Sequence, residues 1–180
     1  LMEEGYIIPY YNHSSNKHYE ECRFAHDRFQ QAVYSLISEE DKPLIHYKIG
    51  QVLLSKNKEE TEEAGVFELV NHLNEAKTLI KTAKELHELC LLNYNAGIKA
   101  RNSNAHKDAL HYFKNAVELV PSDTWTNNFE FTFSLFLAKA EAEYLNLNIT
   151  EADKNIDSLL SRARNNMEKA TLLERKLINY

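Results

Sequence analysis

The chain has 180 residues, of which 43% are hydrophobic and 27% charged, and its formal net charge is −6. A chain of this size can bury a continuous core, and its 4 glycines and 3 prolines favour helices over a fold with many tight turns. The negative charge and the lack of a strongly basic run argue against a nucleic-acid-binding surface.

The first 26 residues differ in pattern from the rest. Residues 5–11 and 19–26 are short, partly aromatic or β-branched segments, and the turn-forming sequence NHSSNK separates them. This pattern predicts a β-hairpin, with Pro9 placing the first arm at a sheet edge because proline has no amide to donate. We therefore expect a β-hairpin unit over residues 1–26 and a helical domain over residues 27–180.

Helical periodicity begins at Asp27, which we expect to cap or complement the start of the first helix. Residues 38–43 interrupt the pattern, and a second helix follows with Asp41 as its expected cap. The acidic sequence NKEETEEAG then precedes a third helix. The apolar stripes expected to be buried are Phe29, Ala32, Val33, Leu36 and Ile37; Leu44, Ile45, Ile49, Val52 and Leu53; and Val66, Phe67, Val70 and Leu73.

The clearest helical hairpin covers residues 78–121. One helix is expected to begin near Thr78 and to end around residues 102–104, and a second follows over residues 105–121. The stripe of the second helix is Ala109, Tyr112, Phe113, Ala116, Val117 and Val120, and Pro121 ends it. The order of Gly97, Ala109, Phe113, Ala116 and Pro121 resembles a degenerate tetratricopeptide repeat, because the aromatic positions of the first helix do not match that pattern.

Residues 125–147 predict a helix that is apolar on two sides. One stripe is Phe129, Phe133, Phe136, Leu137, Ala140 and Tyr144, and the opposite stripe is Phe131, Leu135, Ala138, Ala142 and Leu145. Such a helix is expected to be buried on both sides, as in the middle of a stacked array. A capping box is expected at Thr150 and Asp153, followed by another helix and by a last helix over residues 170–180.

The fold class predicted from these elements is all-α, built from tetratricopeptide-like antiparallel hairpins (an α-solenoid) with a short amino-terminal β-hairpin. Four phrases also resemble the helical region that follows the AAA-type or STAND-type ATPase module of large bacterial signalling proteins with serine/threonine kinase, GAF or histidine kinase domains. These are FAHDRFQQAVYSLI (24–37), HYKIGQVLL (46–54), VFELVNHLN (66–74) and LNYNAGIKARNSNAHKDALHYF (92–113). The resemblance implies that residues 5–26 end a winged-helix segment, and it implies no catalytic residue.

Several residues are candidates for chemical sites. Adjacent His26, Asp27 and Arg28 suggest an acid/base cluster, but neighbouring residues at a helix start point in different directions, so a structural role is favoured. A zinc site formed on the predicted hairpin by His13, His18, Cys22 and His26 is disfavoured, and no other metal or cofactor is expected. No glycine-rich phosphate loop or nucleophile elbow is present, so we expect no enzyme. The lack of a long apolar run predicts no membrane span and a cytoplasmic location.

We expect a partner-binding groove at the first helix of the clearest hairpin. Placed by the match at Gly97, its residues are Tyr94, Ile98 and Arg101, which suit an apolar or helical protein partner better than a terminal carboxylate. The predicted function is a non-catalytic interaction and signal-relay segment that contacts a protein, a peptide or neighbouring domains. The alternatives are a small-molecule sensor with a pocket lined by Trp125, Phe129 and Tyr94, and a hydrolase using His26 and Asp27.

Overall fold

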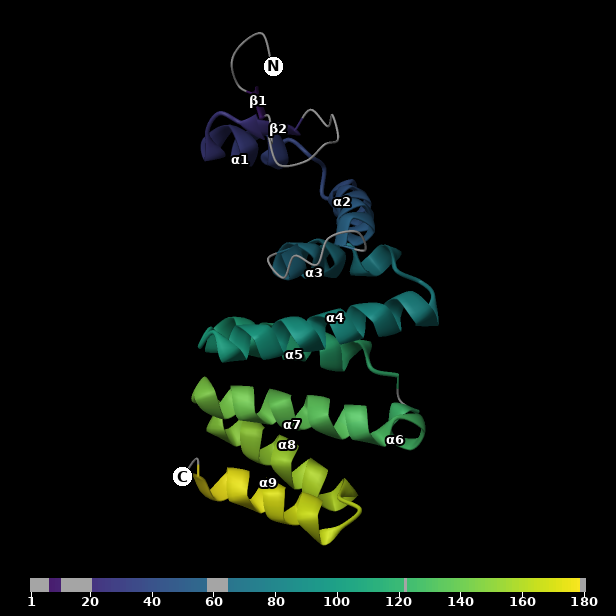
Figure 1. Ribbon diagram of the computed structural model, residues 1–180, viewed down its shortest axis with the longest axis vertical. Coiled ribbons are helices and arrows are strands. Elements are labelled where there is room, and N and C mark those ends of the chain that lie inside the picture. The colour runs from purple at the N-terminus through teal and green to yellow at the C-terminus, as the bar shows by residue number, and fades with distance from the viewer. Residues whose placement is uncertain (1–6, 11–20, 58–64, 122, 179–180) are drawn as a thin grey trace.

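The computed structural model describes residues 7–10, 21–57, 65–121 and 123–178. Two short strands, β1 (Ile7–Tyr10) and β2 (Glu21–Phe24), pair antiparallel with Ile7 opposite Phe24. The segment 11–20 that would connect them as a hairpin lies outside the described residues. The rest of the described chain is helical and forms an elongated stack from α1 to α9 (Figure 1).

The helices succeed one another down this stack in chain order, and consecutive helices pack as pairs: α2 with α3, α4 with α5, and α7 with α8. The prediction of a predominantly helical chain is confirmed. The helices are α1 (Asp27–Ser35), α2 (Lys42–Asn57), α3 (Val66–Glu75), the 3-10 turn η2 (Lys77–Leu79), α4 (Ala83–Asn102), α5 (His106–Leu119), α6 (Thr124–Asn127), α7 (Phe129–Leu145), α8 (Ile149–Arg162) and α9 (Asn166–Ile178).

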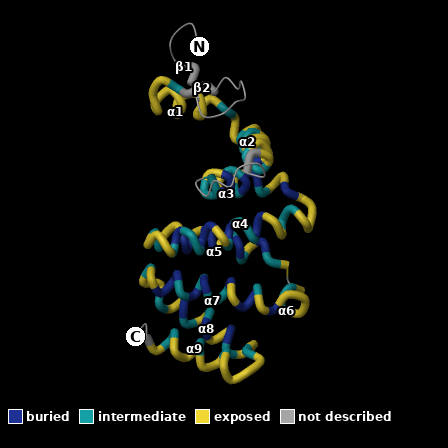
Figure 2. Tube along the Cα trace, viewed as in Figure 1, coloured by how far each residue is buried: buried dark blue, intermediate teal, exposed yellow. Residues whose placement is uncertain are grey.

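Helix α1 contradicts the expectation that its apolar stripe is buried. None of its residues, all of which the structure describes, is buried. Phe29 is 39% exposed, Val33 36%, and Leu36, just beyond the helix, 85%. The pattern of α1 is that of a core-facing helix, but α1 lies at one end of the stack and most of its residues are exposed (Figure 2).

Two hydrophobic clusters lie on opposite sides of α7, so the predicted two-sided burial of this helix is confirmed. The first cluster joins α3, α4 and α5 to one side of α7, through Leu135, Ala138 and Ala142. The second joins the other side of α7, including Phe129 and Phe133, to α8 and α9. The buried members of the second cluster are Phe129, Phe133, Ala140, Tyr144, Ala152, Ile156, Leu159 and Leu172.

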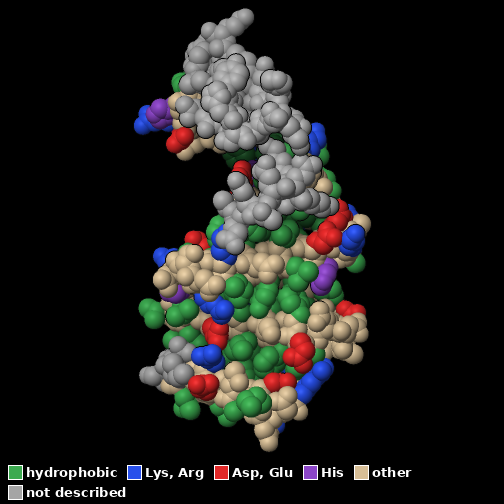
Figure 3. Space-filling model, viewed as in Figure 1, with side chains coloured by type: hydrophobic (Ala, Val, Ile, Leu, Met, Phe, Trp, Pro, Cys, Tyr) green, Lys and Arg blue, Asp and Glu red, His purple; other side chains and the backbone are tan. Residues whose placement is uncertain are grey.

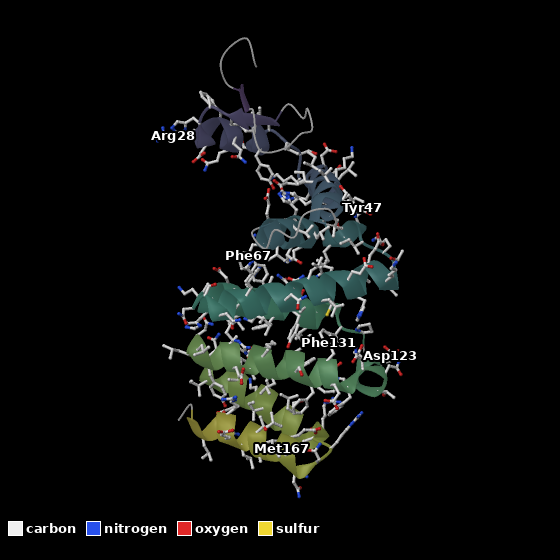
Figure 4. The ribbon with its side chains drawn as sticks, in the orientation of Figure 1. Arg28, Tyr47, Phe67, Asp123, Phe131 and Met167 are labelled. Atoms are coloured by element: carbon white, nitrogen blue, oxygen red, sulfur yellow. The ribbon has the colours of Figure 1, made fainter. Side chains whose placement is uncertain are left out.

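Leu145 is the exception in the predicted stripes of α7. It is 47% exposed, because α7 ends at this residue and the chain turns towards α8. Phe131, in contrast, packs against the first cluster and lies between the α4–α5 layer and α7 (Figure 4). The helical period therefore predicts the two faces correctly but not where the helix leaves the core.

The two best-packed hairpins turn in the same way. In the α4–α5 turn, the amide of Ala105 donates to the carbonyl of Ala100 over 2.9 Å; in the α7–α8 turn, the amide of Asn148 donates to Glu143 over 2.9 Å. Each turn contains a residue with positive φ, at 59° for Asn104 and 62° for Leu147. This is the hydrogen-bond pattern of a Schellman motif, which usually places glycine or asparagine at the positive φ. The same connection is thus built twice from different sequences.

Leu147 is the unfavourable choice at this position, because a left-handed conformation brings Cβ close to the following carbonyl. It is also 83% exposed, so its side chain contributes little burial. Leu147→Gly is expected to raise the free energy of unfolding by about 1 kcal/mol, as measured by urea denaturation. Asn104→Gly is the matched control and should raise the free energy of unfolding by less, since asparagine tolerates positive φ. Equal increases in the two variants would contradict the explanation by backbone strain at Leu147.

Several helix starts differ in detail from the predictions. The cap of α1 is His26, whose Nδ1 accepts a hydrogen bond from the Arg28 amide over 3.2 Å, while Asp27 lies in the first turn, where its charge complements the helix start as the second expected alternative had it. Helix α4 begins at Ala83, after a capping box between Thr82 and Glu85 that the predicted start near Thr78 missed. The structure also contradicts the predicted capping box at Thr150 and Asp153.

Thr150 and Asp153 lie inside α8, whose N-cap is Asn148. Asp153 instead accepts a hydrogen bond from the Tyr144 hydroxyl over 2.6 Å, which ties α8 to α7. The last helix also begins earlier than predicted, at Asn166. Within the described ranges, no helix combines the length and the apolar character needed to cross a membrane.

Candidate functional site

A pocket of about 690 Å³ lies between α2 and α4. Its floor is apolar and includes the buried side chains of Leu73, Ile80 and Leu89. This volume falls within the range of about 300–1,000 Å³ that is typical of ligand pockets. The described residues that line it are Tyr47, Gln51, Leu54, Ser55, Leu73, Ile80, Glu85, Glu88, Leu89, Leu91, Leu92 and Asn95.

Helical spacing explains why these side chains converge. Tyr47, Gln51 and Leu54 follow one another at intervals of four and three, so they share the face of α2 that points towards α4. Glu88, Leu92 and their neighbours do the same on α4. Figure 4 labels Tyr47 on α2, the helix that supplies this side of the pocket lining. The pocket is therefore a groove between two non-consecutive helices, closed below by Leu73 of α3 and by Ile80, which follows η2.

Carboxylates mark one edge of the groove. The Tyr47 hydroxyl donates to Glu85 Oε1 over 3.3 Å, and the Thr82 hydroxyl donates to Glu85 Oε2 over 2.6 Å. The hydrogen bonds from Thr82 hold the pKa of Glu85 below its usual value, so this group is ionised at neutral pH. Glu88 Oε1 lies 3.9 Å from Lys84 Nζ on the exposed surface.

The groove offers groups that can bind a ligand. Its described lining residues carry hydroxyl, amide and carboxylate groups over an apolar floor, and none of these lining residues is a cysteine, histidine or lysine. A nucleophile paired with a base is the usual arrangement for covalent catalysis. The groups that are present can form hydrogen bonds with a ligand and bury its apolar part.

The predicted site residues Tyr94, Ile98 and Arg101 lie beside this groove, on the part of α4 that faces α7. The ring of Tyr94 is 5.4 Å from that of Phe131, and Ile98 packs against the first cluster. Arg101 Nη1 lies 2.9 Å from Glu141 Oε2 on α7. All three side chains are half-buried, so they join adjacent layers in this structure.

The residues that line the groove on α2 have the same register as the predicted site residues on α4. Tyr47, Gln51 and Leu54 stand at −3, +1 and +4 from Gly50, as Tyr94, Ile98 and Arg101 do from Gly97. A methyl group added at Gly50 would lie 2.5 Å from Cδ2 of Leu73, and one added at Gly97 would lie 2.5 Å from Cε1 of Phe113. Gly50 was therefore the sequence signal that could have located the α2 side of the groove.

The alternative pocket lined by Trp125, Phe129 and Tyr94 is wrong. Trp125 and Phe129 belong to the second cluster, with ring centroids 6.0 Å apart, whereas Tyr94 packs against the first cluster. Helix α7 separates the two clusters. Arginines also cover the Trp125 end, with Arg162 Cζ 4.6 Å from the Trp125 ring centroid.

The proposed acid/base cluster has a structural explanation. His26 accepts the Arg28 amide as the helix cap, and its ring packs edge-on against Phe29 at a centroid distance of 6.5 Å. His13 and His18, two of the candidate zinc ligands, lie outside the described residues. Within the described residues, no group of three or more His, Cys, Asp or Glu side chains is arranged to hold a metal ion.

Cys90 is buried rather than reactive. Its thiol donates to the carbonyl of Ala116 over 3.4 Å, and burial raises its pKa to about 11. At neutral pH it is therefore a protonated packing residue on the α4–α5 interface.

Comparison with known proteins connects the chain with a signalling kinase. The curated protein hybrid signal transduction histidine kinase G of Dictyostelium discoideum is 28% identical over 181 residues, covering 87% of this chain. The chain spans about 5% of the length of that kinase. No protein-family model and no solved structure matches the chain.

Proposed function

We propose that this chain is a non-catalytic, tetratricopeptide-like segment of a larger cytoplasmic signalling protein, and that it binds a protein segment in the groove between α2 and α4. The observation that carries the proposal is the groove itself, which has an apolar floor, a polar edge and no nucleophile–base pair among its described lining residues. The similarity to a hybrid signal transduction histidine kinase supports the signalling context.

The packing supports a repeat array. The α4–α5 and α7–α8 hairpins share one turn geometry, and Gly50 and Gly97 each meet a buried side chain of the following helix. A stack of such hairpins presents its first helices side by side, which creates an elongated binding surface. On one face, hydrophobic side chains gather over the layers from α4 to α9, with charged groups interspersed (Figure 3).

The proposed signal relay depends on contacts between helices of successive layers, here α4, α7 and α9. Glu141 on α7 joins Arg101 on α4 and Arg175 on α9, with the Glu141 Oε1 to Arg175 Nε distance at 2.9 Å. These ion pairs cross three layers. A partner that shifts α2 against α4 would therefore move a helix that is connected to α7 and α9. The connection is made by these ion pairs and by apolar packing.

The groove is tested by selecting peptides from a random display library on the immobilised 180-residue chain and by measuring their binding calorimetrically. Gln51→Trp fills the pocket from an exposed position and should weaken binding at least tenfold, about 1.4 kcal/mol. Gln31→Trp on α1 is the matched control and should leave affinity unchanged. Failure to select any peptide, or binding that survives Gln51→Trp, would reject the groove as the binding site.

A small-molecule sensor is the second candidate, because the volume of about 690 Å³ also suits a metabolite. A thermal-shift screen with a metabolite library distinguishes the two. A ligand present at 100 times its Kd would add about 2.7 kcal/mol of stability. A shift seen with the unmodified chain and lost in Gln51→Trp would favour sensing over protein binding.

A further inference from the structure

The α2–α4 groove and the contact between α4 and α7 occupy corresponding places in the stack. Tyr47 stands three residues before Gly50 on α2, as Tyr94 stands three residues before Gly97 on α4. Against Tyr94 lies the ring of Phe131 from α7, at a centroid distance of 5.4 Å (Figure 4). The α4–α7 contact therefore shows which kind of side chain packs beside a tyrosine in this register.

The α4 residue that corresponds to Phe131 is Glu88. Phe131 stands 16 residues before Leu147, the residue with positive φ in the α7–α8 turn. Glu88 stands 16 residues before Asn104, which has positive φ in the α4–α5 turn. Both Glu88 and Tyr47 line the pocket. A carboxylate thus takes the place of an aromatic ring, and because burying its charge would be costly, this layer contact remains open.

The charged side chains of the groove have one sign. Among the described lining residues, the charged ones are Glu85 and Glu88, and no lysine or arginine is included. Glu88 does lie 3.9 Å from Lys84 Nζ, but these side chains are 56% and 86% exposed, so the pair contributes little. A cation brought by a ligand would therefore meet two carboxylates beside an apolar floor, which is an arrangement of complementary charge.

Given the protein-binding function proposed for the groove, on which this step rests, we propose that the groove binds a basic, apolar segment of a partner protein. In this segment an aromatic or other large apolar side chain stands close to a lysine or arginine. The apolar side chain covers the floor at Leu73 and Leu89, both of which are buried. The cation pairs with Glu88 and Glu85 at the edge of the groove.

Peptide selection tests this preference. A random display library is selected on the immobilised 180-residue chain, and peptides that also bind the Gln51→Trp variant are discarded, because they do not need the groove. In the remaining peptides, a lysine or arginine within about four residues of an aromatic residue or leucine is expected to be enriched about threefold or more over the unselected library.

Calorimetry with the tightest selected peptide then measures the contribution of Glu88. Glu88→Gln removes the charge at nearly constant size, so affinity should fall about tenfold at low salt and less at high salt, where ions screen the pair. Glu88→Lys should bind a peptide whose basic residue is changed to glutamate more tightly than it binds the selected peptide. Glu151→Gln is the matched control, because Glu151 also forms an exposed ion pair with a lysine, on α8, and should leave affinity unchanged.

Glu88→Phe tests the correspondence with α7. The new ring takes the place in the groove that Phe131 has in the next layer, so peptide affinity should fall at least about tenfold. Thermal unfolding of the variant shows that it remains folded. Peptide binding at full affinity in folded Glu88→Phe would contradict the correspondence between Glu88 and Phe131.

The outcomes separate this inference from the proposed function. The inference is rejected if the groove peptides show no preference for a basic residue near the apolar one, or if Glu88→Gln binds them as tightly as the unmodified chain. Binding that is lost in Gln51→Trp would then still support the groove as a protein-binding site. If no selected peptide needs the groove, the proposed function is rejected together with the inference.

Discussion

Phe113→Ala is expected to lower the free energy of unfolding by about 3–5 kcal/mol, as is typical when a buried aromatic ring is removed. Phe113 is 0% exposed and fills the interface between α4 and α5. Its ring lies 6.1 Å from that of Tyr94 and directly beneath the backbone of Gly97. The change leaves a cavity that the surrounding helices cannot close, because they pack against each other along their length. Urea denaturation measures the expected loss in the free energy of unfolding.

Met167→Ala is the control for this prediction. Met167 is 77% exposed on α9, so its truncation should change stability by less than about 0.5 kcal/mol. A loss of similar size in both variants would mean that the α4–α5 interface is not the stable core of the chain.

A double-mutant cycle tests why position 97 is glycine. Gly97→Ala alone should destabilise by about 1–3 kcal/mol, because its methyl group would lie 2.5 Å from the Phe113 ring. Combined with Phe113→Ala, the same change should be neutral or stabilising, since alanine favours a helix by roughly 1 kcal/mol over glycine. Equal costs in the two backgrounds would contradict direct contact between the residues.

Lys139→Met is expected to cost about 3–5 kcal/mol, because it leaves a buried carboxylate without its counter-ion. Glu143 is 3% exposed, and its Oε1 lies 2.6 Å from Lys139 Nζ, one turn earlier on α7. Asn155 on α8 donates to the other carboxylate oxygen. The group sits where α7 meets α8, so the uncompensated charge should weaken this interface. Urea denaturation of the variant measures the loss.

The control is an exposed ion pair of the same type. Lys154 Nζ and Glu151 Oε1 lie 2.7 Å apart on α8 with side chains 66% and 60% exposed, so Lys154→Met should cost less than about 1 kcal/mol. Adding Glu143→Gln to Lys139→Met removes the uncompensated charge and should restore most of the lost stability. If Lys139→Met lowers the free energy of unfolding as little as Lys154→Met does, burial of the Lys139–Glu143 pair does not determine its contribution to stability.

The sequence predicted the interior of the stack well. The period of the stripes on residues 125–147 identified a helix buried on two sides, and the close approach of Gly97 to Phe113 agrees with the expected hairpin. These features are local, because a helical stripe is a property of residues three and four apart. The capping box at Thr82 was equally readable from the sequence but was missed, because the apolar pattern suggested an earlier start.

The sequence did not reveal where the groove lies or which helix end is left open. The same register occurs around Gly50 and Gly97, yet the pocket forms beside α2, while Tyr94 is covered by Phe131 of α7. Likewise, α1 carries a core-like stripe, yet none of the residues of this helix is buried. The sequence by itself determined which faces of each helix are apolar. Only the tertiary structure decided which of these faces meet, because that depends on how far each layer is offset from the next.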